Sequence, residues 1–326
     1  MSPLLEIRGL KVQFATGGGV VQAVDGVDLA LAPGETLGVV GESGCGKTVT
    51  ALSILKLIPM PPGRIAGGAI LWRGRDLVPL AGAALARVRS KEIGIVFQEP
   101  MTALNPVYTV VAQIAETLRR HERLGRHAAR DKAVEMLRLV QIPSPERRVR
   151  DYPHQFSGGQ RQRAMIAMAL ACAPQLLIAD EPTTALDVTI QAQILDLIAE
   201  MKARLGMAVM LITHAMGVVA ETAERVVVMY AGRVVEEAPV GELFARPLHP
   251  YTQGLIRSIP RLGGSQGKKA RLNAIPGVVP DLAHPPPGCR FAPRCPFVSA
   301  ACTAAPPPLR EVAPGHKVAC VLGGGG

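Results

Sequence analysis

The stretch GESGCGKT, residues 41–48, matches the pattern G-x-x-x-x-G-K-[ST] and decides the fold of this chain. An aliphatic segment at residues 36–40 precedes it, and a segment with helical spacing follows at residues 49–58. The glycines allow backbone N–H groups to curl around phosphates, and the start of the helix adds partial positive charge. We therefore expect a nucleotide site in which Lys47 contacts the β- and γ-phosphates and the Thr48 hydroxyl binds Mg²⁺.

Three short aliphatic segments predict buried strands of a parallel sheet, at residues 36–40, 176–179 and 209–212. Each is followed by polar or glycine-rich residues and then by helical spacing, which is the pattern of an α/β fold. Residues 109–139 also have helical spacing, and residues 226–237 have the pattern of a β-hairpin. Ligands of open parallel sheets bind beyond the carboxyl ends of the strands, so the residues just after these segments are the candidates for chemistry.

Asp180 and Glu181 stand at the end of the second aliphatic segment. A P-loop needs a carboxylate from a neighbouring strand in the Mg²⁺ shell, and we expect Asp180 to supply it. Glu181 is then placed to orient or deprotonate a water molecule for attack on the γ-phosphate. The alternative interpretation is an acidic helix N-cap ahead of Pro182, and the P-loop upstream makes it the weaker of the two.

Residues 156–160, FSGGQ, precede a helical stretch at residues 161–173. Ser157 is a favourable helix N-cap, and the two glycines after it leave the start of the helix open to close approach by an anion. Alone this pattern is a weak signal. Its position shortly before Asp180 makes it specific.

The composition limits the class of protein. The chain has 326 residues, 48% of them hydrophobic and 19% charged, which excludes a disordered chain and permits a sizeable core. Aromatic residues make up 3%, which argues against stacked bases as ligands, and we expect no nucleic-acid partner. The net charge of +10 is compatible with a polyanionic ligand, with an anionic membrane surface, or with an excess of basic side chains that face solvent and have no partner. With no signal peptide or membrane-span pattern visible, we expect a soluble, cytoplasmic chain.

In this order, the P-loop, the FSGGQ segment and the Asp180-Glu181 pair resemble an ABC-type ATPase domain, an α/β fold with a P-loop and a helical subdomain. The resemblance implies ATP and Mg²⁺ as ligands. It implies that Gln98 contacts Mg²⁺ and the attacking water and senses the membrane partner, that residues 185–187 form the D-loop, and that His214 contacts the γ-phosphate. The implied catalytic residues are Glu181, His214 and Gln98, and the implied Mg²⁺ ligands are Thr48, Gln98 and Asp180.

The family's nucleotide contacts carry over residue by residue. Phe14 lies where relatives place an aromatic side chain against adenine. In this family the signature segment of one domain completes the γ-phosphate site of another, so a chain with one P-loop must pair with a second ATPase domain. The implied ATP contacts are Phe14, Ser43, Gly44, Cys45, Gly46, Lys47, Thr48 and Val49, and in trans Ser157, Gly158, Gly159 and Gln160. Ala215 is a departure, because relatives often carry Asp after the histidine.

Residues 152–163, 179–190 and 249–252 resemble the ATPase subunits of dipeptide and oligopeptide importers. Residues 165–171 are more similar to the first of that system's two ATPase subunits than to the second. The resemblance implies ATP hydrolysis that drives import of di- or oligopeptides, by a subunit peripheral on the cytoplasmic face of the cell membrane. It implies as partners two transmembrane permease subunits, a second ABC ATPase subunit in a heterodimer, and an extracytoplasmic solute-binding protein.

The sequence alone does not exclude other functions. Relatives in this branch also import nickel, glutathione or opine-like cargo, and the ATPase subunit does not touch the cargo. A soluble ABC ATPase acting on DNA or ribosomes is the alternative of another class. Such proteins usually carry two cassettes or a long coiled-coil insertion, and this sequence has neither.

Four cysteines, Cys289, Cys295, Cys302 and Cys320, lie in a proline-rich segment with the spacing C-x5-C-x6-C-x17-C. They could hold zinc, an iron–sulfur cluster or two disulfides, and a reducing cytosol disfavours disulfides. The gaps are wider than those of common zinc knuckles. The segment resembles the tail of peptide-importer ATPases, some of which carry a [4Fe-4S] cluster; this favours the cluster over zinc, with free thiols as a third interpretation.

The sequence predicts two parts. An ABC ATPase domain is expected at residues 1–260, with its helical and signature region at about residues 99–170. A C-terminal extension with the four cysteines is expected at residues 261–326. The composition changes at this boundary, where paired glycines and lysines indicate a linker and prolines become frequent.

Overall fold

The computed structural model describes residues 2–184, 186–259 and 275–323, and its contacts divide the chain into two units. Unit 1 comprises Met1–Ser2, Leu31–Thr36 and Pro79–Ile212. Unit 2 comprises Pro3–Ala30, Leu37–Val78 and Thr213–Gly326. The expected linker around residue 260 lies outside the described residues.

Unit 1 contains a three-stranded parallel sheet. Strands β6 (Ile93–Val96), β7 (Leu176–Asp180) and β8 (Ala208–Thr213) pair in this order. Every residue of β7 is buried, as expected for an aliphatic strand of a parallel sheet that is covered on both faces. The strands predicted at residues 176–179 and 209–212 are confirmed, with slightly wider bounds.

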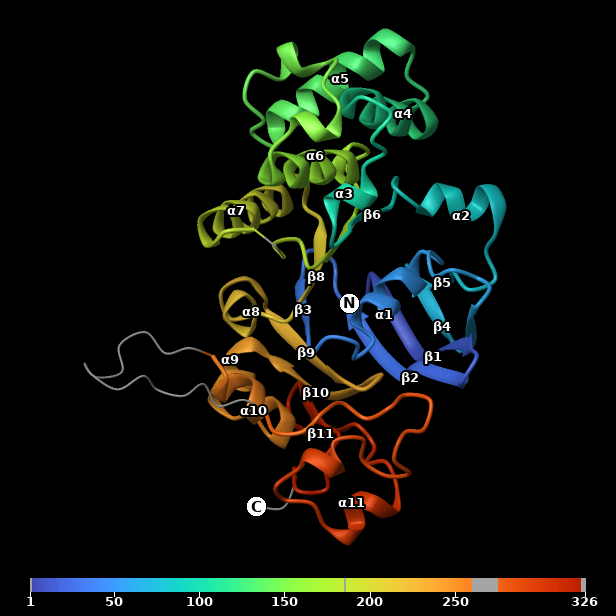
Figure 1. Ribbon diagram of the computed structural model, residues 1–326, viewed down its shortest axis with the longest axis vertical. Coiled ribbons are helices and arrows are strands. Elements are labelled where there is room, and N and C mark those ends of the chain that lie inside the picture. The colour runs from blue at the N-terminus through green and yellow to red at the C-terminus, as the bar shows by residue number, and fades with distance from the viewer. Residues whose placement is uncertain (1, 185, 260–274, 324–326) are drawn as a thin grey trace, which may run out of the picture. The chain divides into compact units, whose positions relative to one another are not determined.

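The helices of unit 1 include a packed group of three, α4 (Val110–Glu122), α5 (Arg126–Leu139) and α6 (Gly158–Leu170), seen together in Figure 1. The prediction of helix over residues 109–139 is therefore correct except for a break. Arg123 takes a left-handed φ of 56° there and ends α4, and Gly125 caps the start of α5. The remaining helices are α2 (Gly82–Val88), α3 (Pro100–Ala103), η1 (Pro145–Arg148), η2 (Pro153–Gln155) and α7 (Val188–Leu205).

Unit 2 contains two groups of strands. The first has the order β2-β1-β4-β5 and consists of β2 (Gly19–Leu31), β1 (Leu5–Thr16), β4 (Gly63–Trp72) and β5 (Arg75–Asp76). The second has the order β11-β12-β10-β9-β3 and consists of β11 (Arg310–Ala313), β12 (His316–Val318), β10 (Arg233–Pro239), β9 (Arg225–Tyr230) and β3 (Thr36–Val40). β3 and β9 are parallel, and β9 and β10 form the predicted hairpin, whose turn is Ala231-Gly232 with positive φ at both residues.

The helices of unit 2 are α1 (Lys47–Ile54), α8 (Met216–Thr222), α9 (Val240–Ala245), α10 (Pro250–Arg257), η3 (Ala292–Arg294) and α11 (Ala300–Ala304). The helix expected at residues 49–58 is shorter and begins earlier, as α1. It stops before Leu55, because Lys56 takes a positive φ of 50° and leaves the helical conformation.

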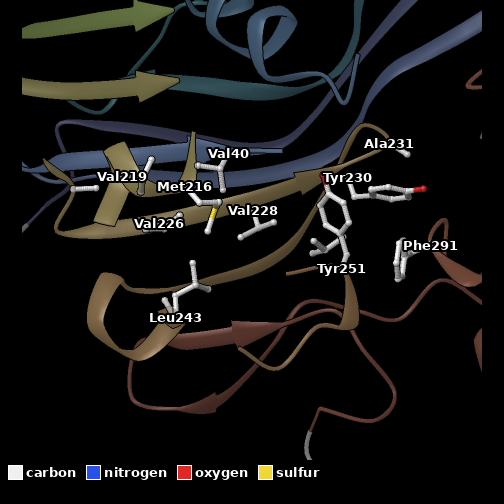
Figure 2. Packing of buried hydrophobic residues seen from close by; sticks show 13 residues of the cluster. Val40, Met216, Val219, Val226, Val228, Tyr230, Ala231, Leu243, Tyr251 and Phe291 are labelled. Atoms are coloured by element: carbon white, nitrogen blue, oxygen red, sulfur yellow. The ribbon is translucent and has the colours of Figure 1, made fainter. Parts of the chain in front are cut away.

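A buried cluster joins strands β3, β9 and β10 to the chain after residue 275 (Figure 2). The ring centroid of Phe291 lies 5.2 Å from that of Tyr230 and 5.5 Å from that of Tyr251. Aromatic pairs at such separations add to the stabilisation from buried apolar area. The cysteine-bearing segment therefore shares a hydrophobic core with unit 2.

Among the residues that the structure describes, no helix is both long enough and apolar enough to cross a membrane.

Candidate nucleotide site

The predicted phosphate loop lies in unit 2 and leads from β3 into α1. Lys47 is the first residue of α1, and its buried Nζ donates hydrogen bonds to the carbonyl oxygens of Gly41 (2.7 Å) and Glu42 (3.0 Å). The ammonium group is therefore held inside the curve of the loop. Ser43 and Gly44 are exposed at the tip, and Thr48 and Val49 follow in the first turn of α1.

The loop needs its glycines where it approaches other backbone. Gly41 has φ 151°, and a Cβ there would lie 2.2 Å from the carbonyl oxygen of Met229. Gly46 has φ 101°, and a Cβ there would lie 2.6 Å from the carbonyl oxygen of Ala23. Neither carbonyl belongs to a flexible side chain, so only glycine fits. A glycine-shaped loop, a helix start and one lysine make a cradle that fits nucleotide phosphates.

Two further predicted site residues, Phe14 and His214, belong to unit 2. Phe14 is half-buried on β1 and pairs with Gly63 on β4, whose hypothetical Cβ would lie 2.8 Å from the phenylalanine ring. His214 is exposed and directly follows β8. Ala215 begins α8 as its N-cap, and its N–H donates to Thr213 Oγ1 at 3.0 Å.

The acidic pair lies in unit 1, at the carboxyl end of β7. Asp180 is buried, and the Glu181 N–H donates to the Ile212 carbonyl at 2.9 Å. Gln98 follows β6, and its Nε2 donates to Glu181 Oε2 at 3.1 Å. The Thr184 hydroxyl donates to the same oxygen at 2.8 Å. The structure thus brings Gln98, Thr184 and Glu181 together within hydrogen-bond distance.

The FSGGQ segment, also in unit 1, begins α6 with a capping box. The Gln160 N–H donates to Ser157 Oγ at 3.3 Å, and the Ser157 N–H donates to Gln160 Oε1 at 3.1 Å. This confirms Ser157 as the helix N-cap. A Cβ on Gly159 would lie 3.0 Å from Ile190, so this glycine permits close packing on α7. Of the expected D-loop, Ala185 lies outside the described residues and Asp187 caps α7.

The four tail cysteines lie in unit 2, and two of them are joined by backbone, since the Cys289 N–H donates to the Cys302 carbonyl at 2.7 Å. Burial raises the pKa of Cys289 and of Cys295, and the nearby Cys302 and Cys320 thiols raise both further. Within residues 2–184, 186–259 and 275–323, however, no three cysteine, histidine or acidic side chains are grouped as metal ligands. The thiols as placed do not fit a metal or cluster.

Three residues that contact predicted site residues were not themselves predicted from the sequence: Tyr251, Arg294 and Thr184. The Tyr251 hydroxyl accepts a hydrogen bond from the Glu42 N–H at 2.8 Å, and burial raises the pKa of Tyr251. Arg294 forms an ion pair with the Glu42 carboxylate. Tyr251 lies in the segment 249–252 that marks the importer branch, but no sequence signal identifies it as a partner of the loop. Thr184 lies in the segment ADEPTT, three residues after Glu181. This spacing is the sequence signal that could have identified Thr184 as a contact of Glu181.

Known proteins are similar to this chain over nearly its whole length. Residues 24–184 match the ABC transporter family, and residues 235–302 match the family of the oligopeptide/dipeptide transporter C-terminal region. A "probable peptide ABC transporter ATP-binding protein" of Sinorhizobium fredii is 56% identical, covering 97% of this chain and 94% of its own. The "oligopeptide transport ATP-binding protein" of Bacillus subtilis is 53% identical, covering 97% and 87%.

Solved structures agree with these relatives. An ATP-binding cassette in a dimeric post-hydrolysis state, bound to ADP and Pi, has a TM-score of 0.65 at 27% identity, covering 72% of this chain and 98% of its own. A Clostridium perfringens component of an ABC transporter complex has a TM-score of 0.63 at 26% identity, covering 76% and 92%.

Proposed function

The chain belongs to the ABC transporter family, and we infer that it is the ATP-hydrolysing subunit that powers a peptide importer. The observation that carries this inference is the 56% identity to a peptide transporter ATP-binding protein across nearly the full length of both chains. The match of residues 235–302 to the C-terminal region of oligopeptide and dipeptide transporters supports the same cargo class. The chain has the mixed α/β fold of ABC cassettes.

We propose the following roles in ATP hydrolysis. The loop from Gly41 to Thr48 binds the phosphates, with Lys47 on the β- and γ-phosphates, and Phe14 contacts adenine. Mg²⁺, held by Thr48, Gln98 and Asp180, would offset phosphate charge when bound. Two donors orient the carboxylate of Glu181, which suits a group that must position a water molecule for attack. His214 contacts the γ-phosphate, and Ser157 to Gln160 contribute to the site of a second ATPase domain.

A peptide importer requires membrane permeases and a substrate-binding protein as partners. We propose the finer arrangement of two permease subunits, a heterodimer with a second ATPase subunit, and a peripheral position on the cytoplasmic face. Exposed apolar side chains after Gln98 support docking to a permease, because Met101, Val107 and Tyr108 are 54%, 70% and 56% exposed. Isolated exposed apolar residues are ordinary, but three within eight residues are a candidate contact surface.

The tail cysteines carry a separate proposal. We propose that Cys289, Cys295, Cys302 and Cys320 bind a [4Fe-4S] cluster, with zinc as the alternative. Support comes from the resemblance of this segment to the tail of peptide-importer ATPases and from the backbone hydrogen bond between Cys289 and Cys302. Iron, acid-labile sulfide and zinc assays on anaerobically purified protein test this. Stoichiometric zinc, or neither metal, would contradict the cluster.

The importer itself is tested by co-purification from detergent-solubilised membranes of the native host. Recovery with two multi-span proteins and a second ATPase is the expected result, followed by transport assays with peptides, nickel, glutathione and opines. Recovery with ribosomes or DNA alone would contradict the importer. The ATPase activity is tested separately, by phosphate release from Mg·ATP.

A further inference from the structure

The segment from Cys289 to Cys295 forms a tight turn whose side chains contact the phosphate loop and the turn between β9 and β10. The N–H groups of Ala292, Arg294 and Cys295 each donate to a carbonyl three residues earlier, and Phe291 anchors the turn in the core. Two arginines project from this turn. Arg290 donates to Asp25 Oδ2 at 2.6 Å and to the carbonyl of Ala231.

Arg294, the second arginine, reaches the phosphate loop directly. Its guanidinium donates to both oxygens of the Glu42 carboxylate, at 2.6 and 3.0 Å. The same side chain donates to the carbonyl oxygens of Pro276 and Ile275 and to the Tyr230 hydroxyl. Only 4% of the Arg294 side chain is exposed, against 29% of Glu42. A buried two-point contact of this kind fixes both geometry and charge.

Glu42 occupies a sensitive place in the loop. It is the second residue of the GESGCGKT stretch and its only acidic residue. Its carbonyl accepts from Lys47 Nζ, and its N–H donates to Tyr251. If the loop binds a triphosphate, as proposed above, a carboxylate on the loop adds negative charge near it. Like charges repel, and a counter-charge close to one of them reduces the repulsion.

We propose that Arg294 is a positioning residue of the nucleotide site: by pairing with Glu42 it offsets the negative charge of the phosphate loop and so raises its affinity for ATP. The C-terminal turn then serves ATP binding through Glu42. This inference rests on the proposed function, because it assumes that the loop binds ATP.

The test measures the dissociation constant for Mg·ATP by calorimetry on the purified full-length protein. Arg294→Ala leaves the Glu42 charge without this partner and is expected to weaken binding about 5- to 10-fold. Glu42→Gln removes the negative charge and is expected to bind ATP as tightly as the wild type or more tightly. The double variant is expected to bind within about 2-fold of Glu42→Gln.

Loss of charge compensation weakens binding only in Arg294→Ala, whereas loss of a purely structural contact would weaken binding in both single variants. Arg246→Ala breaks an exposed ion pair with Glu242 in the same unit and is the matched control, expected to leave the constant unchanged. The inference is overturned if Arg294→Ala binds ATP as tightly as the wild type. It is also overturned if the double variant binds ATP as weakly as Arg294→Ala. If Arg294→Ala does not fold, weakened binding in Glu42→Gln alone would overturn it. Absence of ATP binding by the wild type would instead refute the proposed function.

Discussion

Gln98 donates a hydrogen bond from Nε2 to Glu181 Oε2, across 3.1 Å. The Thr184 hydroxyl donates to the same oxygen. The backbone of Glu181 is also unusual, because its φ of 45° lies in the left-handed region, which costs a residue with a side chain about 1–2 kcal/mol. Such conformations persist where the surroundings fix a functional group. Glu181 is therefore held in one orientation by its backbone and by two side chains.

Replacement of this carboxylate should separate binding from turnover. Glu181→Gln keeps the shape and removes the charge, so ATP should bind as in the wild type while phosphate release falls by at least about 100-fold. Single-turnover phosphate release and calorimetry measure the two effects. Thr184→Val is the companion variant; it removes one of the two donors and should slow turnover only several-fold. Wild-type turnover in Glu181→Gln would remove Glu181 from its proposed role.

The glycines of the phosphate loop should differ in their tolerance of a side chain. Gly41→Ala places a Cβ 2.2 Å from a backbone oxygen, so we expect a loss of at least about 3 kcal/mol in the free energy of unfolding. Gly44→Ala is the matched control. Its φ of 77° is also positive, but no atom lies within 4 Å of the added Cβ, so the loss should stay near 1 kcal/mol. Denaturant unfolding measures both, and equal losses would show that steric contact does not govern the loop.

These features differ in how far the sequence predicts them. The phosphate loop, the strand before Asp180 and the hairpin turn at Ala231-Gly232 follow from local patterns, because each depends on the conformations available to neighbouring residues. The helix break at Arg123 was missed, since helical spacing continues on both sides of it. The pairing of Arg294 with Glu42 joins residues 252 positions apart, and no local pattern encodes it. Cysteine spacing likewise predicts proximity of the thiols but not the arrangement of a ligand set.

The N-cap of α6 should matter for catalysis beyond its effect on stability. Ser157→Ala removes the side-chain acceptor at the helix start and should lower the free energy of unfolding by about 1 kcal/mol. Thr109→Ala removes the equivalent acceptor from α4, whose Thr109 Oγ1 accepts from the Ala112 N–H at 3.2 Å. Both variants should lose similar stability. Only Ser157→Ala should also lose turnover at saturating ATP, assayed with the full complement of ATPase subunits. An equal loss of turnover in Thr109→Ala would assign the defect to stability.

His249 should make the stability of unit 2 depend on pH. Burial lowers the pKa of His249 to about 4, and its Nδ1 accepts from the Tyr251 N–H as the N-cap of α10, so the folded protein holds the imidazole neutral. The unfolded chain binds a proton near pH 6.5, so between pH 6.5 and 4 it holds more protons than the folded chain. Stability contributed by neutral His249 is therefore present above pH 6.5 and falls by up to about 3 kcal/mol as the pH drops to 4. His249→Asn keeps a capping acceptor without a titrating group. Urea unfolding at several pH values should give a shallower dependence for the variant, and identical slopes would contradict a neutral buried histidine.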